Sequence, residues 1–393
     1  NAGSMPDKTE VTRMPVTQQE KKVEYIELIY DLIFVYIIGR NNALLDQIEN
    51  GFVPGPVFLA YILCTLAAIQ IWNYSTFYIN VYGQNDFRDH IFLFINMYLL
   101  YYMGDGIRVR WEHSFYKYTI AWVLILANIG LQHLIELRHH RAAPWIYAQL
   151  KIKAAIILCE AALVVVHILV YTFTGVSIAW VPILFGITSM LVSGRHNFVV
   201  PVDFPHLTER AMLYIVFTFG EMIIAVSPYF SEELSPNSIY FATMTFLIVV
   251  GLFLSYGTLY NKIIDRERTT DGAVYMVLHI FLIFSLNNLS IALQFMRLES
   301  IALLPKTLFL TGSFVVYFVF LFLTGLYAKE SCRFSRHFIL IVLAVAASFA
   351  VLMILFREQM YINIAISVLY VFGIYLLLYR QSRPQDSLPS GSS

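Results

Sequence analysis

Charged residues are scarce in this sequence. Only 13% of the 393 residues are charged, about half the fraction found in an ordinary soluble domain. The 26 acidic residues balance the 26 basic ones. The chain therefore lacks the strongly basic surface of a nucleic-acid-binding protein, and it also lacks a glycine-rich phosphate loop. We expect neither nucleic acid as a partner nor a soluble cofactor.

Cysteine is rare as well. Cys64, Cys159 and Cys332 have spacings that fit neither a disulfide framework nor a zinc site, so we interpret them as packing residues. His206 and Glu209 form an H-x-x-E pair with a spacing that metal sites use, but further ligands are missing nearby. We predict no metal centre. The sequence also shows no motif of a catalytic nucleophile.

Apolar residues are abundant. They make up 59% of the chain, and aromatic residues alone make up 16%. Apolar runs of roughly 18 to 25 residues, long enough to cross a bilayer, follow one another with short breaks. We predict an all-α polytopic membrane protein with about twelve transmembrane helices, at residues 24–45, 55–80, 88–104, 115–136, 150–174, 178–194, 207–228, 237–262, 271–296, 305–327, 336–356 and 360–380.

The ends of the chain are polar. Residues 1–23 form a polar tail without a signal peptide, residues 1–4 precede the first methionine as a cloning remnant would, and residues 381–393 are predicted to be disordered. Most Lys and Arg residues fall on the same side as the N-terminus, and this excess predicts that both termini are cytoplasmic. The basic residues in connections on the other side are Arg108, Arg110, Lys117, Arg297, Lys306 and Arg357.

Short matches recur at a nearly constant offset. Glu27 matches Glu209 and the segment 74–78 matches 256–260, both 182 residues apart, while 90–93 matches 279–282 at an offset of 189. These matches predict two six-helix repeats at residues 24–194 and 207–380. Because six is even, the repeats would enter the membrane in the same direction. Chance matching in a restricted alphabet is the alternative.

Acidic residues lie inside the first and seventh predicted helices. Glu27 and Asp31 are four residues apart and share a helix face with Phe34, Ile38 and Asn41. A charge at the centre of a transmembrane helix costs about 2.5 to 3.5 kcal/mol on insertion scales, so such residues should face the protein interior or a hydrated cavity.

The seventh helix carries Glu209 and the deeper Glu221. For Asp31 and Glu221, ion or proton handling and structural hydrogen bonding between helices both stay open. For Glu27 and Glu209 we favour a structural role, such as pairing with the basic residues Arg210, Arg195 or Lys22.

Further polar residues lie within the apolar segments. They are Glu160 and His167 on one face of the fifth helix, Asn287 and Asn288 in the ninth, Arg40 about 180° around the first helix from Asp31, His90 and His279 at the starts of equivalent helices, and the matched Tyr74 and Tyr256. The two histidines could sense or relay protons, although a position at the membrane interface is our favoured interpretation.

Two motifs connect the chain to a known family. The segment Glu27-Leu28-x-x-Asp31-Leu32-x-Phe34-Val35 resembles the E-L-F-F-D-L-V-F-V signature of the bacterial low temperature requirement A family, and His206-Leu207-x-Glu209-Arg210 with 220–226 resembles its second motif. The resemblance implies a bacterial membrane protein linked to growth in the cold. The first helix is also similar, more weakly, to that of the lysosomal potassium and proton channel family.

These observations favour an ion or small-solute channel or transporter in the bacterial cytoplasmic membrane. Its path would run between helices 24–45 and 207–228, with Phe34, Ile38 and Phe217 as a constriction. We expect lipid and a small ion or solute as partners, and a homodimer stays open. The pathway residues would be Glu27, Asp31, Glu209, Glu221, Asn41, Asn287, Asn288, Glu160 and His167. The alternatives are a membrane enzyme that acts on lipid through His206 and Glu209, and a structural or sensor protein.

Overall fold

The structure, a computed structural model, describes residues 21–105, 111–140, 144–194, 202–230 and 235–383. Within these ranges the fold is all-α, as predicted. The predicted tails lie almost entirely outside the described residues, and so does Arg195. The twelve α-helices described are α1 Tyr25–Asn41, α2 Gly55–Tyr82, α3 Phe87–Asp105, α4 Trp111–His139, α5 Pro144–Thr174, α6 Trp180–Gly194, α7 Phe204–Val226, α8 Pro236–Thr258, α9 Ala273–Arg297, α10 Leu303–Leu323, α11 Arg336–Leu355 and α12 Met360–Gln381.

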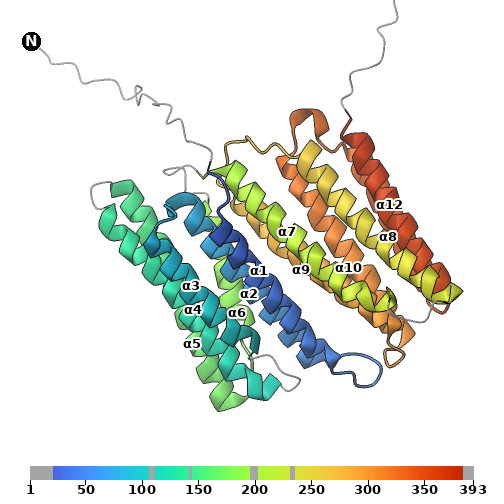
Figure 1. Cartoon of the computed structure of the whole chain (residues 1–393), viewed down its shortest axis with the longest axis horizontal. Coiled ribbons are helices and arrows are strands. Elements are labelled where there is room, and N and C mark those ends of the chain that lie inside the picture. Colours follow the sequence, from blue (N-terminus) through green and yellow to red (C-terminus); the bar gives the residue numbers. More distant parts are fainter. Residues whose placement is uncertain (1–20, 106–110, 141–143, 195–201, 231–234, 384–393) are drawn as a thin grey trace, which may run out of the picture.

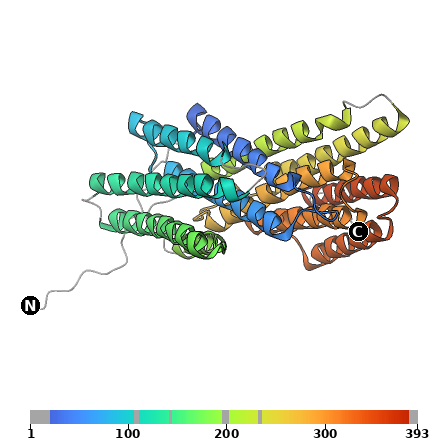
Figure 2. The ribbon, with the colours of Figure 1, turned by 90° about the horizontal axis from the view of Figure 1, so that it is seen from below.

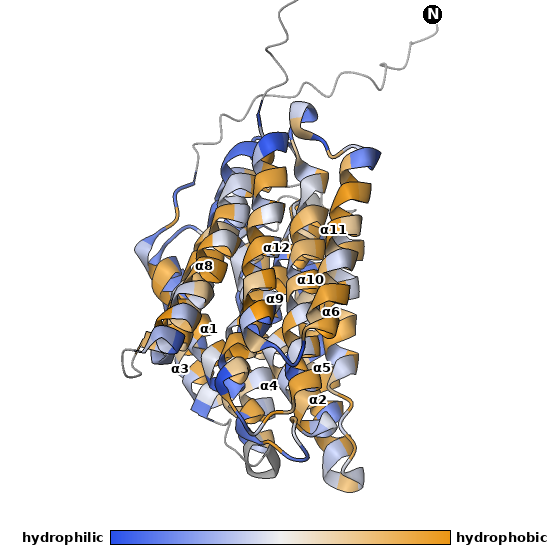
Figure 3. Cartoon of the chain, turned by 90° about the vertical axis from the view of Figure 1, so that its right-hand side faces the viewer, coloured by the Kyte–Doolittle hydropathy of each residue, from blue (hydrophilic) through white to orange (hydrophobic). Residues whose placement is uncertain are grey.

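Ten of the described helices are long and apolar enough to cross a membrane. The two others are α3, whose first turn contains Arg88 and Asp89, and α6, which is apolar but has only 15 residues. Figure 3 shows apolar residues along the helices and hydrophilic residues at the two ends of the bundle. The helices are thus those of a multi-pass membrane protein, and membrane crossing by α3 and α6 stays a prediction.

Several helices begin at caps that the sequence supplies. The side chain of Asp203 accepts a hydrogen bond from the backbone N–H of His206 and caps α7. Ser235 and Ser335 cap α8 and α11 in the same way. A cap satisfies one of the backbone N–H groups that have no partner inside the helix. The cap of α7 matters for the site described below, because His206 and Arg210 lie in the first two turns of this helix.

The two halves of the chain pack corresponding helices against each other. In the first half α1 packs on α3, α3 on α4, α2 on α6 and α5 on α6, and the same pairs recur as α7 with α9, α9 with α10, α8 with α12 and α11 with α12. Figures 1 and 2 show α1–α6 and α7–α12 as two groups side by side. This correspondence is what the predicted repeat requires, and the repeat itself stays a prediction.

The halves meet where α1 and α2 pack against α7 and α9, and we call this contact the seam. α1 and α7 run in the same direction along it, because Arg210 near the start of α7 bonds Glu27 near the start of α1, and Glu221 near the end of α7 lies beside Gly39 near the end of α1. α9 is the most enclosed of the ten helices that could cross a membrane, because 89% of its apolar 18-residue stretch is buried inside the protein. The seam therefore passes through the centre of the molecule.

Candidate functional site

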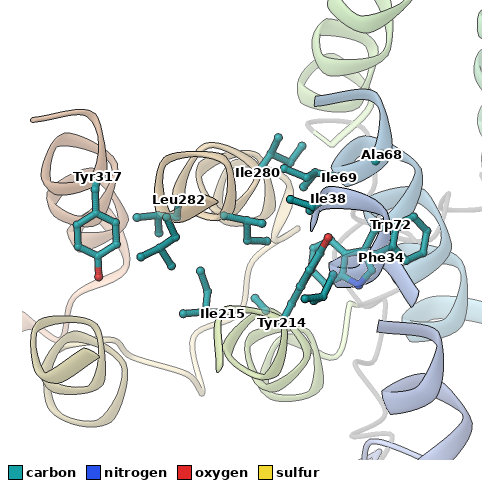
Figure 4. Packing of buried hydrophobic residues seen from close by; sticks show 14 of the residues in the cluster. Phe34, Ile38, Ala68, Ile69, Trp72, Tyr214, Ile215, Ile280, Leu282 and Tyr317 are labelled. Atoms are coloured by element: carbon teal, nitrogen blue, oxygen red, sulfur yellow. The ribbon is translucent and has the colours of Figure 1, made fainter. Parts of the chain in front are cut away.

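The middle of the seam is apolar. Phe34 and Ile38 of α1 pack with Ile69 of α2, Tyr214 of α7 and Ile280 of α9, and all five side chains are buried. Figure 4 shows them filling the space between the two groups of helices. Tight packing of large side chains leaves little room for water, so this layer closes the seam in the described structure.

An ionic network lies on one side of this apolar layer. The guanidinium of Arg210 donates from Nε to Oδ2 of Asp31 at 3.2 Å and from Nη2 to Oδ1 at 2.5 Å. Its Nη1 donates to Oε2 of Glu27. Arg210 and Asp31 have no exposed surface, and Glu27 is 2% exposed. The planar guanidinium thus joins two carboxylates of the first half to the second half, in the bidentate geometry that arginine favours.

Two further side chains lie against the carboxylates. Nε1 of Trp72 donates to Oδ1 of Asp31 at 2.8 Å, and Nε2 of His206 lies 3.5 Å from Oε2 of Glu27. The other ring nitrogen of His206 lies 3.0 Å from Nδ2 of Asn80. Two carboxylates face one guanidinium, so the network carries one unbalanced negative charge unless His206 or one acid holds an additional proton.

Lys21 covers the network at the end of the bundle where α1 begins. Its ammonium donates to the carbonyl oxygen of Gly83 at 2.6 Å, and its backbone N–H donates to Oδ2 of Asp203 at 3.1 Å. Burial lowers the pKa of the Lys21 ammonium from its ordinary value, while the carboxylates of Glu27, Asp89 and Asp203 act in the opposite direction. The cation closes the ionic network from this side.

An amide network lies on the opposite side of the apolar layer. Asn42 and Asn287 exchange two hydrogen bonds, at 3.0 and 2.8 Å. The hydroxyl of Tyr61 donates to Oδ1 of Asn288 at 2.5 Å and accepts from Nδ2 of Asn287 at 2.9 Å. Asn41 bonds Thr65 at 3.4 Å. Both halves contribute to this network too, so the seam has polar groups at two levels with an apolar layer between them.

The predicted acids do not all meet at one point. Glu221 lies beside Gly39, which is eight residues beyond Asp31 on α1, or about 12 Å along the axis. Glu209 and Glu221 are half-buried, and the described residues give neither of them a hydrogen bond or an ion pair. Phe217 is half-buried against the core. The two levels of acid on α1 and α7 are thus separated by the apolar layer.

Glu160 and His167 share a helix face but have separate partners. Glu160 is bonded by Tyr74 and Gln70 of α2. His167 accepts a hydrogen bond from the backbone N–H of Ile178 at 3.2 Å.

The matched histidines differ. His90 bonds Asn85 at the start of α3, whereas His279 is buried and lies 3.2 Å from the hydroxyl of Tyr256. Arg40 is only partly buried and lies close to Gly104 of α3.

Several polar residues of the interior are absent from the sequence-based selection. Trp72, Tyr61 and Gln70 bond the predicted residues, and Arg88 pairs with the buried Glu136 at 2.7 Å. Gln70 and Trp72 could have been found from the sequence, because they lie in the run Gln70-Ile71-Trp72-Asn73-Tyr74 inside an apolar helix. Neutral polar residues in the middle of a span face protein rather than lipid.

Comparison with known proteins identifies the family. The model of the bacterial low temperature requirement A protein family (LtrA) matches residues 22–371. The chain therefore belongs to this family, which confirms the identification made from the two motifs. Searches of curated proteins and of solved structures gave no match. The family and the apolar helices together identify a bacterial multi-pass membrane protein.

Proposed function

We propose that this member of the low temperature requirement A family moves a proton or a small cation across the membrane along the seam. The observation that carries this proposal is the order of polar and apolar levels. The ionic network, the apolar layer and the amide network follow one another along α1, and both halves of the chain contribute to each level. Polar sites separated by an apolar constriction are typical of closed transport paths.

In this proposal the acids bind the cargo in place of Arg210. The two carboxylates attract a cation, and the guanidinium occupies their oxygens in the closed state. A relative movement of the two halves would separate Arg210 of α7 from Glu27 and Asp31 of α1 and free the acids. The closed pairing and the open site then differ by a rigid-body shift at an interface, which is a common form of conformational change.

Phe34 and Ile38 would act as the gate, as the sequence predicts. Glu221 lies beyond them along α1 and is half-buried without a hydrogen bond or an ion pair among the described residues, and in this proposal it receives a cation that has passed the apolar layer. The described basic residues gather at the end where α1 begins, and we propose that this end and both termini are cytoplasmic.

Flux measurements in proteoliposomes test the proposal. Wild type is compared with Glu221→Gln, Asp31→Asn and the gate variant Phe34→Ala, under a proton or potassium gradient. We expect about tenfold lower flux for the two neutralised acids and a higher flux for Phe34→Ala. Glu330→Gln is the matched control, because Glu330 is an acid whose side chain is 92% exposed. Equal flux at the level of empty liposomes in all variants would reject transport.

A structural or sensor role is the second candidate. It is favoured by the ionic network, in which every charged side chain already has a partner within the seam. In that case growth in the cold would survive replacement of Glu221, which makes no hydrogen bond or ion pair with the described residues, and would fail when Arg210 is replaced. The alternative of a lipid enzyme has no comparable support, since His206 faces Glu27 rather than Glu209.

A further inference from the structure

A second buried acid lies away from the seam, inside the first group of helices. Glu160 of α5 has no exposed surface. The hydroxyl of Tyr74 donates to its Oε2, and Nε2 of Gln70 lies 3.4 Å from the same atom. α2 thus presents Gln70 and Tyr74 to α5, one helical turn apart, while Trp72 points to the seam and bonds Asp31.

This carboxyl group differs from those of Glu27 and Asp31 in the seam because it has no cation. No ion pair of Glu160 is found among the described residues. The acidic or basic side chains of α5 nearest to Glu160 are Lys153 and His167, each two turns away, about 10 Å along the axis. Oε1 of Glu160 and Oε1 of Gln70 are both buried without a partner. A buried carboxylate in this environment is expensive unless it takes a proton or a cation.

The backbone of α6 makes room for the cluster. A Cβ atom on Gly186 would lie 1.6 Å from Nε2 of Gln70, 2.4 Å from Oε2 of Glu160 and 2.4 Å from the hydroxyl of Tyr74. The three polar side chains therefore fill the place that the side chain of any residue other than glycine at position 186 would occupy. Side chains thus fill this side of the carboxyl group, and a proton is the cation that needs no further space.

A cavity adjoins this cluster at Tyr74. Its volume is about 40 Å³, and its polar lining residues are Tyr74, His133, Lys153 and Ser193. At roughly 10 to 15 Å³ of such volume per water, it has room for about three water molecules. Lys153 and Ser193 are only partly buried, so the cavity reaches toward the end of the bundle where α1 begins. Tyr74 belongs to both the cavity and the cluster.

We propose that Glu160 is a proton-binding site that exchanges protons with this end of the molecule through Tyr74 and the cavity. For uptake, a protonated water in the cavity gives its proton to the oxygen of Tyr74, and the Tyr74 O–H bond breaks as its proton moves to Oε2 of Glu160. The phenol ends neutral, the carboxylate becomes a carboxylic acid, and release reverses both steps. The inference rests on the proposed transport function only in naming the proton as its cargo.

The Gln70 amide fits both states of the acid. Toward the carboxylate, its NH₂ group donates together with the hydroxyl of Tyr74. After a 180° rotation of the amide, the currently unpartnered Oε1 would take the position of Nε2 and accept a hydrogen bond from the carboxylic acid. The amide can thus offer a donor to the carboxylate and an acceptor to the carboxylic acid, as a reversible proton site requires, and the rotation gives up the bond that Nε2 now donates to the hydroxyl of Tyr74 at 3.1 Å.

Infrared spectroscopy of the purified full-length chain tests the site without any flux measurement. We expect a C=O stretching band of a protonated carboxyl group at neutral pH that Glu160→Gln removes. The matched control is Glu136→Gln, which should leave the band in place, since Glu136 is also buried but pairs with Arg88 at 2.7 Å. In D₂O the band should shift, and Ser193→Leu, which fills the cavity, should slow this shift about tenfold.

The result that would overturn the proposal is a neutral-pH spectrum in which Glu160→Gln removes no such band. If Glu160→Gln fails to fold, Tyr74→Phe replaces it, and the band must then change its frequency because one hydrogen-bond donor is lost; an unchanged band rejects the site. A band in wild type together with absent flux would leave the proton site standing and reject transport along the seam, whereas flux without the band would do the reverse.

Discussion

Glu160 in the first half and Phe349 in the second occupy the interiors of two similarly packed groups of helices. Phe349 lies 189 residues after Glu160, the same offset that separates His90 from His279. Tyr74 and Gln70 bond Glu160, whereas Phe349 stacks on Tyr370 with ring centroids 3.9 Å apart.

The matched tyrosines show the same difference. The hydroxyl of Tyr74 bonds a carboxyl group, whereas the hydroxyl of Tyr256 lies 3.2 Å from Nε2 of His279. The second half builds its interior from aromatic and aliphatic side chains without an acid at this place. Apolar packing is therefore sufficient for such a bundle, and the acid in the first half needs another explanation. We take this as support for a role in proton binding.

The largest loss of stability is expected from replacing Arg210, the cation that the second half supplies to two acids of the first half. Arg210→Gln leaves the carboxylates of Glu27 and Asp31 buried without a positive charge, and breaking a buried ion pair in this way costs about 3 to 5 kcal/mol. Thermal unfolding in detergent, followed by size-exclusion chromatography, measures the loss.

Two further variants make this measurement decisive. Glu209→Gln changes the neighbouring residue, which is half-buried without a partner, and it should stay within about 0.5 kcal/mol of wild type. Adding Glu27→Gln and Asp31→Asn to Arg210→Gln removes the uncompensated charge and should restore most of the stability. If the single and triple variants unfold alike, the network is not held by charge.

The next effect concerns the aromatic interior of the second half. Phe349→Ala removes a side chain that is 3% exposed and stacks on Tyr370, so it should cost about 3 kcal/mol through lost contacts and a cavity. Glu160→Gln keeps the shape of the first interior and an acceptor for Tyr74, and we expect less than about 1 kcal/mol. A larger loss for Glu160→Gln in chemical unfolding would contradict the comparison.

A smaller effect on stability is expected from glycine-to-alanine substitutions on α6 and α12, which cover the interiors of the first and second halves. Gly186→Ala on α6 places a methyl group onto Gln70, Glu160 and Tyr74 and should cost about 1 to 3 kcal/mol through overpacking. Gly373→Ala on α12 is the control, because its Cβ would meet nothing within 4 Å, and alanine is the better helix former. The unfolding temperatures of the two variants should therefore move in opposite directions.

The smallest loss of stability is expected from removing single tyrosine hydroxyls, and its size depends on whether Glu160 is protonated. Tyr74→Phe and Tyr256→Phe each remove one hydroxyl. If Glu160 holds a proton, both lost hydrogen bonds are between neutral groups, and each costs about 0.5 to 1.5 kcal/mol. If Glu160 is ionised at neutral pH, Tyr74→Phe should cost more, about 1.5 to 3 kcal/mol. Parallel unfolding measurements at the same pH distinguish these outcomes.

The sequence predicted some contacts of the candidate site and missed others. Pairing of Glu27 with Arg210 was among the expected options, since both lie near the start of a predicted helix. The bond between Asp31 and Arg210 joins residues 179 positions apart, and no local pattern signals it. His167 was grouped with Glu160 because the two share a helix face, yet the partner of Glu160 is Tyr74 on another helix.

The helices and their membrane location were determined by the sequence alone, because the length and apolarity of each run fix a local structure that needs no knowledge of its neighbours. The partners of the buried acids were decided only by the tertiary structure. Which carboxyl group receives a cation and which one does not depends on the helices that pack beside it, and this arrangement places Arg210 against Asp31 and leaves Glu160 with neutral hydrogen-bond donors.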